Sequence, residues 1–127
     1  MWQQLLFVGM GGALGAAARF SVYNLYELTG SKLFPMPTLI VNVVGSFLIG
    51  IAYFTIVERL QLPPVWKSGL ITGFLGAFTT FSTYSLDALR MIQNGELGVA
   101  VGYLFASVVL CLIATLAGFL LVEKLFS

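Results

Sequence analysis

The sequence predicts an all-α membrane protein with four transmembrane helices per subunit, and its composition and charge spacing carry that prediction. Of the 127 residues, 59% are hydrophobic and 9% are charged, whereas soluble domains carry about 25% charged residues. The six basic and five acidic residues leave four uncharged windows: residues 1 to 18, 33 to 57, 68 to 86 and 97 to 122. Each window approaches the ~20 residues that a helix needs to cross a bilayer.

Turn-forming residues refine the ends of these windows. Pairs of them precede the last three windows: Pro35 and Pro37, Pro63 and Pro64, and Asn94 and Gly95. The expected spans are about 3 to 26, 38 to 57, 66 to 90 and 98 to 122, with connections of about ten residues or fewer. We expect one four-helix transmembrane domain over residues 1 to 127, because the windows are too long and too uniformly apolar for barrel strands.

Small residues four apart mark three of the expected spans: Gly11 and Gly15 in the first, Ser46 and Gly50 in the second, and Gly98, Gly102 and Ala106 in the fourth. Such rows let helix backbones approach closely, which matters in lipid because burial of apolar surface gives little drive for association. The rows therefore predict close helix packing and favour an oligomer, most simply a twofold dimer.

The basic residues divide evenly between the two expected sides of the membrane. Four spans put both termini and the second connection on one side. The two sides carry these groups: Arg59, Lys67 and Lys124 on the side of the termini, and Lys32, Arg90 and Arg19 on the other. Because Lys and Arg show no bias, the positive-inside rule sets no orientation. We predict dual topology, with copies inserted both ways; the alternative is that one marginal charge or the N-terminal amine decides.

Composition also excludes several classes of function. The net charge of +1 and six scattered basic residues provide no basic face for nucleic acid. With no His, one Cys and no carboxylate pair at ligand spacing, the chain lacks the groups for a zinc site, a nucleophile with its base, or paired-carboxylate catalysis. We expect no enzyme activity and no nucleic-acid partner, and we interpret Cys111 as a small apolar packing residue.

A polar stretch falls within the third expected span. Residues 73 to 85, GFLGAFTTFSTYS, combine two glycines with five Ser or Thr residues. Glycines and hydroxyls allow a helix to unwind locally, after which the freed carbonyls can bind a cation. The alternative is a continuous helix in which the hydroxyls bond back to carbonyls one turn earlier.

Aromatic and hydroxyl side chains follow helix faces in the third and fourth spans. Phe81 and Tyr84 lie three residues apart, and aromatic ring edges can stabilise an anion, although without the surrounding motif core packing is the better explanation of the pair. Tyr103, Ser107 and Cys111 form a line at a spacing of four. This line suits either an anion path or ordinary contacts between helices.

The remaining polar groups in the spans are hydrogen-bond donors. Asn42 and Thr38 lie near the start of the second span, and Arg19 lies toward the end of the first. Arg19 either reaches the membrane interface or binds an anion directly. We place all five acidic residues at or beyond span ends, so the expected interior holds no carboxylate. A small exchanger of cationic drugs and protons would need one, and the predicted pathway therefore passes an anion.

The motifs TLIVNVVGSFLIG (38 to 50), GFLGAFTTFSTYS (73 to 85) and GALGAAARF (12 to 20) resemble those of the Fluc fluoride channels, also called the CrcB family, over essentially the whole chain. The resemblance implies an antiparallel dual-topology homodimer in the cell inner (plasma) membrane. It also implies a third helix broken near its middle, two fluoride-selective pores, and passive export of cytoplasmic fluoride that confers fluoride resistance.

The resemblance further implies roles for individual residues. It points to the backbone carbonyls of Gly76 and Thr79 as ligands of a structural sodium ion on the dimer axis. It points to six side chains along the fluoride pore: Asn42, Phe81, Tyr84, Tyr103, Ser107 and Thr38. Arg19 is the arginine of the first motif and a candidate for an anion vestibule.

Two positions depart from the family pattern. Tyr84 stands where Phe is usual, and three roles are open for its hydroxyl: holding fluoride, redirecting it, or pointing away. Cys111 stands where a hydroxyl is common, and its thiol is a weaker donor. The predicted function is a fluoride channel. The alternatives are a small proton-coupled multidrug-type antiporter and a non-transporting membrane assembly subunit.

Overall fold

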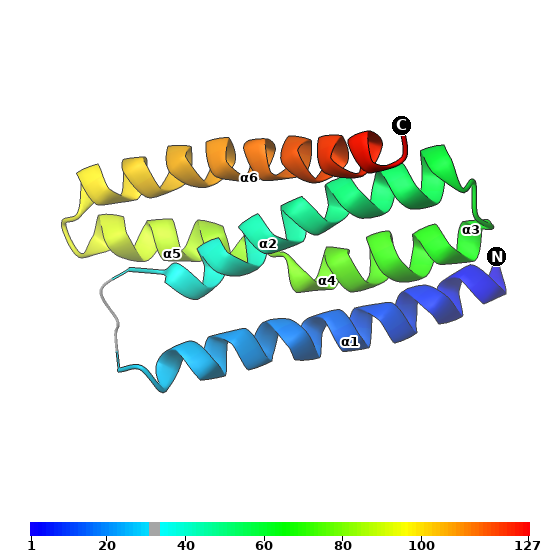
Figure 1. Ribbon diagram of the computed structural model, residues 1–127. Helices are drawn as coiled ribbons and strands as arrows, with labels where there is room; N and C mark the ends of the chain where they lie inside the picture. Colours follow the sequence, from blue (N-terminus) through cyan, green and yellow to red (C-terminus); the bar gives the residue numbers. More distant parts are fainter. Residues whose placement is uncertain (31–33) are drawn as a thin grey trace.

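The computed structural model describes residues 1–30 and 34–127, and the regular elements within these ranges are helical. In chain order they are α1 (Trp2–Glu27), α2 (Met36–Ala52), the π-helical η1 (Tyr53–Arg59), α3 (Pro64–Trp66), the π-helical η2 (Lys67–Leu75), α4 (Gly76–Phe78), α5 (Ser82–Gln93) and α6 (Leu97–Leu125). Figure 1 shows them as long runs lying along one common axis, with both termini at the same end. These elements group into four helical runs, namely α1, α2 with η1, α3 through α5, and α6. The prediction of an all-helical chain with four helices is confirmed.

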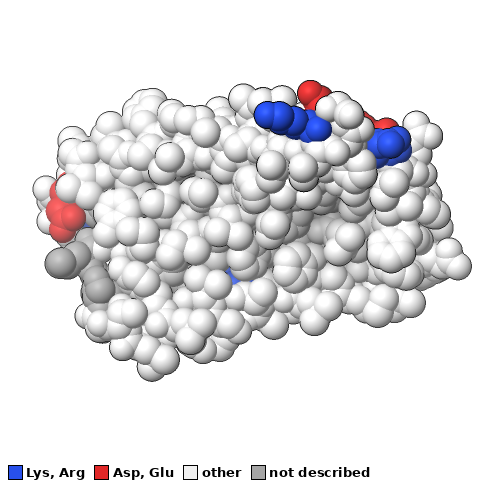
Figure 2. Space-filling view, viewed as in Figure 1, with Lys and Arg blue, Asp and Glu red and all other residues white. Residues whose placement is uncertain are grey.

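Three of these runs are long and apolar enough to cross a membrane by length and composition: Trp2–Glu27, Met36–Arg59 and Leu97–Leu125. Large apolar side chains on them face outward, including Leu14 at 67% exposure and Phe105 at 70%. In Figure 2 most of the visible face is uncharged, and charged side chains gather toward its two ends. Soluble monomers rarely expose apolar surface on this scale. These features are those of a multi-pass membrane protein.

Proline and glycine set several of the helix ends. Pro37 lies in the first turn of α2, and Pro64 begins α3 after an extended Pro63. Proline suits a first turn because the N–H it lacks has no partner inside the helix. Gly95 turns the chain between α5 and α6 with a φ of 80°, a conformation that costs glycine little.

Two of the predicted rows of small residues are used inside the subunit. A Cβ added to Gly15 would collide with the carbonyl oxygen of Phe74, so α1 lies directly against η2. A Cβ added to Gly50 would collide with the carbonyl oxygen of Thr115, so α2 lies against α6. The third row differs, because a Cβ at Gly98 or Gly102 would meet nothing within 4 Å in the described part of the chain.

Between α4 and α5 the backbone leaves helical geometry. Thr79, which follows α4, is extended with φ −85° and ψ 161°, and helix resumes at Ser82. The residues between the two helices, 79 to 81, lie within the polar stretch that the sequence analysis singled out. Carbonyl and N–H groups in this segment therefore need partners outside a regular helix.

Candidate functional site

A groove of about 400 Å³ lies beside the interruption between α4 and α5. It is lined from α2, η2, α4, α5 and α6 and by the residues between α4 and α5. Six of the predicted site residues line it: Asn42, Gly76, Thr79, Phe81, Tyr84 and Ser107. Cys111, a half-buried free thiol, lines it as well. The other three predicted site residues, Thr38, Tyr103 and Arg19, lie outside this groove.

Asn42 on α2 holds the interruption through both ends of its side-chain amide. Its Nδ2 donates to the Thr80 carbonyl oxygen at 2.9 Å, and the Thr80 N–H donates to its Oδ1 at 2.8 Å. An amide Nδ2 carries two hydrogens. One donor of Asn42 is therefore uncommitted after the pair of bonds to Thr80, and the predicted role as a pore amide stays compatible with this geometry.

Arg19 reaches the same interruption from α1. Its Nε donates to the carbonyl oxygen of Ala77 at 3.1 Å, near the C-terminal end of α4. A cation suits this position, because carbonyls without helical partners gather at a helix C-terminus. The bond uses one of five guanidinium N–H groups, so both predicted roles of Arg19, at the interface or on an anion, stay predictions.

Some backbone carbonyls near the interruption accept a hydrogen bond and others do not. The Ala77 carbonyl accepts from Arg19, and the Thr80 carbonyl accepts from Asn42. The N–H and the hydroxyl of Thr79 both donate to the Leu75 carbonyl. Among the described residues, no hydrogen bond outside the helices reaches the carbonyls of Gly76, Phe78 or Thr79. Two of these three, Gly76 and Thr79, are the carbonyls that the family resemblance assigned to a cation.

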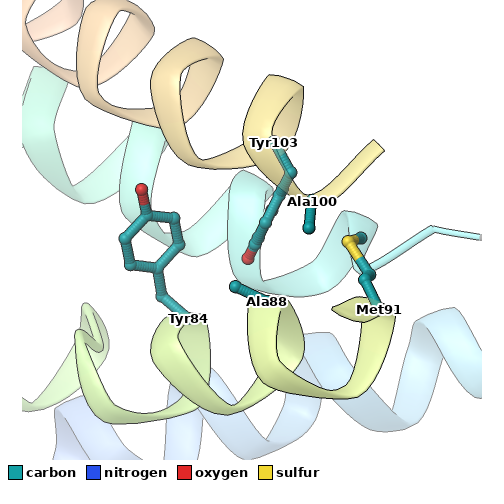
Figure 3. Packing of buried hydrophobic residues seen from close by; sticks show 5 residues of the cluster. All are labelled: Tyr84, Ala88, Met91, Ala100 and Tyr103. Atoms are coloured by element: carbon teal, nitrogen blue, oxygen red, sulfur yellow. The ribbon is translucent and has the colours of Figure 1, made fainter. Parts of the chain in front are cut away.

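The two predicted rings lie together at the groove. The centroids of Phe81 and Tyr84 are 5.4 Å apart, with the ring planes at 61°. Phe81 is 77% exposed, whereas Tyr84 is 6% exposed. The Tyr84 hydroxyl donates to the Leu104 carbonyl oxygen at 2.6 Å, so of the three roles open for it, the geometry favours pointing away from the groove. Figure 3 shows the Tyr84 side chain extending from α5 toward α6.

A second polar cluster lies on the far side of Tyr84. The centroid of the Tyr103 ring is 5.2 Å from that of Tyr84. The Tyr103 hydroxyl donates to Oδ2 of Asp87 at 3.3 Å, and the Thr38 hydroxyl donates to the same oxygen at 2.7 Å. Because Thr38 gives its only hydrogen to the carboxylate, Tyr23 must be the donor in the contact between its hydroxyl and Thr38. Four side chains thus form one connected hydrogen-bond network.

The placement of Asp87 corrects the sequence interpretation. That interpretation put every acidic residue at or beyond a span end, but Asp87 lies inside α5 and accepts bonds from two predicted pore residues. A signal was present: Asp87 follows Tyr84 by three residues and therefore shares its helix face. Asp87 also lines a second cavity of about 300 Å³, together with the charged Arg90 and Glu96. The sequence analysis also missed Tyr23, which is four residues after Arg19 on α1.

Ser107 has an unusual hydroxyl. The side chain is 4% exposed, and its Oγ is the buried side-chain polar atom without a hydrogen-bond partner in the described part of the chain. Buried hydroxyls are nearly always paired, because an unpaired one costs about 1–3 kcal/mol. A groove-lining donor of this kind is suited to a ligand that accepts hydrogen bonds.

Comparisons with known proteins all point to one protein family. The family model described as CrcB-like protein, Camphor Resistance (CrcB), matches residues 6–119. The chain is 48% identical over 120 residues to a protein of Saccharophagus degradans named fluoride-specific ion channel FluC, covering 94% of this chain and 90% of that one. It is 44% identical to the protein of the same name from Hahella chejuensis over 114 residues, or 90% of each chain. A third, from Francisella tularensis subsp. mediasiatica, is 44% identical over 126 residues, or 96% of each chain.

Proposed function

The chain belongs to the CrcB family, and on that premise we propose that it is a fluoride-selective channel that exports cytoplasmic fluoride passively across the cell inner membrane. Its relatives are named as ion channels, so the family is one of channels and not of enzymes. No energy source is needed, because a negative interior favours exit of an anion by about 2.3 kcal/mol per 100 mV.

The unpaired, buried Ser107 hydroxyl in the groove carries this proposal. Fluoride is small and strongly hydrated, so a narrow path must replace its water with donors at each step. The free Nδ2 hydrogen of Asn42 and the edges of the Phe81 and Tyr84 rings supply positive charge in the same groove. The hydroxyls of Thr38 and Tyr103 lie on the far side of Tyr84, where both donate to Asp87, so either one would donate to fluoride only after leaving that carboxylate.

The pore belongs to a homodimer in this proposal. The groove is open on a single subunit, and Phe81 stands 77% exposed beside it. A second copy in antiparallel orientation would cover it, and twofold symmetry would then produce two pores. The even split of Lys and Arg supports insertion in both orientations. A reporter fused to the C-terminus should give signal from both sides of the membrane, and signal from one side only would refute dual topology.

A structural sodium ion at the interruption is the next part of the proposal. The Gly76 and Thr79 carbonyls are left over by the surrounding bonds, and oxygen atoms are the ligands that hard cations prefer. Two subunits would contribute two copies of each carbonyl on the dimer axis. We expect purification in a larger cation instead of sodium to lower the melting temperature of the dimer, measured by thermal unfolding in detergent. Equal melting temperatures in both cations would argue against the site.

Fluoride efflux from liposomes tests the function directly. Purified protein is placed in liposomes loaded with fluoride and chloride, a potassium ionophore is added, and ion-specific electrodes record the loss of each anion. The expected result is fast fluoride loss without chloride loss, because the donors suit the smaller and more strongly hydrated anion. Absence of fluoride loss would refute the channel. Transport that requires a pH gradient would instead support an antiporter, for which Asp87 would be the carboxylate.

A further inference from the structure

The hydroxyl of Tyr84 bonds to a helix carbonyl rather than to a groove-lining side chain. The ring lines the groove, but its Oη donates at 2.6 Å to the Leu104 carbonyl oxygen on α6. The side chain is 6% exposed and is held between the Phe81 and Tyr103 rings, with centroids 5.4 and 5.2 Å away. The bond therefore has a fixed geometry and joins α5 to α6 beside the groove.

Ser107 lies three residues beyond Leu104 on α6. A serine or threonine inside a helix commonly donates to the carbonyl three or four residues earlier. Other hydroxyls of this chain do so: Ser21 and Thr115 donate to the carbonyl four residues earlier, at 2.9 and 3.0 Å, and Thr29 and Ser127 donate to the carbonyl three residues earlier, at 2.7 and 2.9 Å. The Ser107 Oγ is buried and makes no such bond within the described residues. One of its two usual acceptors, the Leu104 carbonyl, is the oxygen that Tyr84 occupies.

We propose that Tyr84 is a positioning residue whose hydroxyl occupies the Leu104 carbonyl and thereby keeps the Ser107 hydroxyl free to donate to an anion in the groove. The ligand class is a small anion that accepts hydrogen bonds, so this inference rests on the proposed channel function. The Tyr84 hydroxyl acts through Ser107 and does not itself touch the anion.

Charge supports the same arrangement. A carbonyl oxygen carries partial negative charge and has two lone pairs that only accept hydrogen bonds. Leu104 lies inside α6, so the helix uses one lone pair and the Tyr84 phenol uses the other. The nearby Ser107 O–H has no acceptor among the described residues. An arriving anion then gains a hydrogen bond without breaking one, which avoids the cost of displacing an existing partner.

A double-mutant cycle in the liposome assay tests the coupling. Tyr84→Phe removes only the hydroxyl, Ser107→Ala removes the free donor, and the third variant carries both changes. Each single change is expected to lower the rate of fluoride efflux by about two- to tenfold, the range of one hydrogen bond. The double variant should be no slower than the slower single variant, because both changes disable the same donor. Tyr53→Phe, at a 41% exposed tyrosine outside the groove, is the matched control and should leave the rate unchanged.

The outcomes separate this inference from the channel function. Unchanged or faster efflux in Tyr84→Phe would overturn it. So would a Ser107→Ala change that slows efflux by the same factor in the parent protein and in the Tyr84→Phe variant. Absence of fluoride efflux in the unsubstituted protein would overturn the proposed function as well. Gel filtration and thermal unfolding should show that the variants assemble to the same extent as the parent protein. A loss of efflux accompanied by loss of assembly in Tyr84→Phe would assign the bond to folding and would also overturn the inference.

Discussion

Replacing Phe81 with isoleucine is expected to abolish fluoride efflux from liposomes while dimer assembly is retained. Phe81 is 77% exposed at the open side of the groove, so its removal takes away few contacts within the subunit. Isoleucine keeps much of the apolar bulk but has no quadrupole, and it therefore offers no positive ring edge to an anion. The efflux rate is read with a fluoride electrode, and assembly is read by gel filtration of the purified variant.

A control for the Phe81 experiment exists on α6. Phe105 is 70% exposed and lies outside the groove, so Phe105→Ile makes the same chemical change at a similar exposure. We expect its efflux to match that of the parent protein. If Phe81→Ile conducts fluoride as well as Phe105→Ile does, the Phe81 ring is not part of the pore.

The elements of the fold that could be predicted are those set by local sequence. Long uncharged stretches and the prolines between them predict helices without knowledge of tertiary contacts, and the all-helical chain confirms this. The π-helical segments η1 and η2 were not predicted, because the change from hydrogen bonds between residues four apart to bonds between residues five apart depends on packing against neighbours. Hydropathy alone also fails to show which glycine row lies inside the subunit, as the contrast between Gly50 and Gly102 demonstrates.

The same distinction between contacts within one helix and contacts between helices applies to the candidate site. A spacing of three predicted that Phe81 and Tyr84 are neighbours, and their rings do meet, with Phe81 just before α5 and Tyr84 in its first turn. Spacing could not show that Asn42 meets Thr80 or that Thr38 meets Asp87, since these partners are on different helices. The prediction of a polar set without a carboxylate also missed the half-buried Asp87, whose carboxylate accepts from the hydroxyls of Thr38 and Tyr103.

Replacing Asn42 with aspartate is expected to reduce fluoride efflux by about a hundredfold or more and to lower stability. Aspartate keeps an acceptor for the Thr80 N–H but cannot donate to the Thr80 carbonyl, and its charge repels both that oxygen and the permeating anion. Leaving a buried carbonyl unpaired costs about 1–3 kcal/mol; because the Thr80 carbonyl is only partly buried, the free energy of unfolding should fall by about 1 kcal/mol, the lower end of that range. Efflux and denaturant unfolding in detergent measure the two effects.

Two further variants show which property of Asn42 matters. Asn94→Asp makes the same change in the connection between α5 and α6, away from the groove, and should leave efflux and stability near the parent values. Asn42→Ala removes both bonds to Thr80 without adding charge, so it should also slow efflux if the amide is needed to hold the interruption. Efflux at the parent rate in Asn42→Ala would show that the interruption keeps its conducting geometry without the amide, and the loss in Asn42→Asp would then be an effect of charge alone.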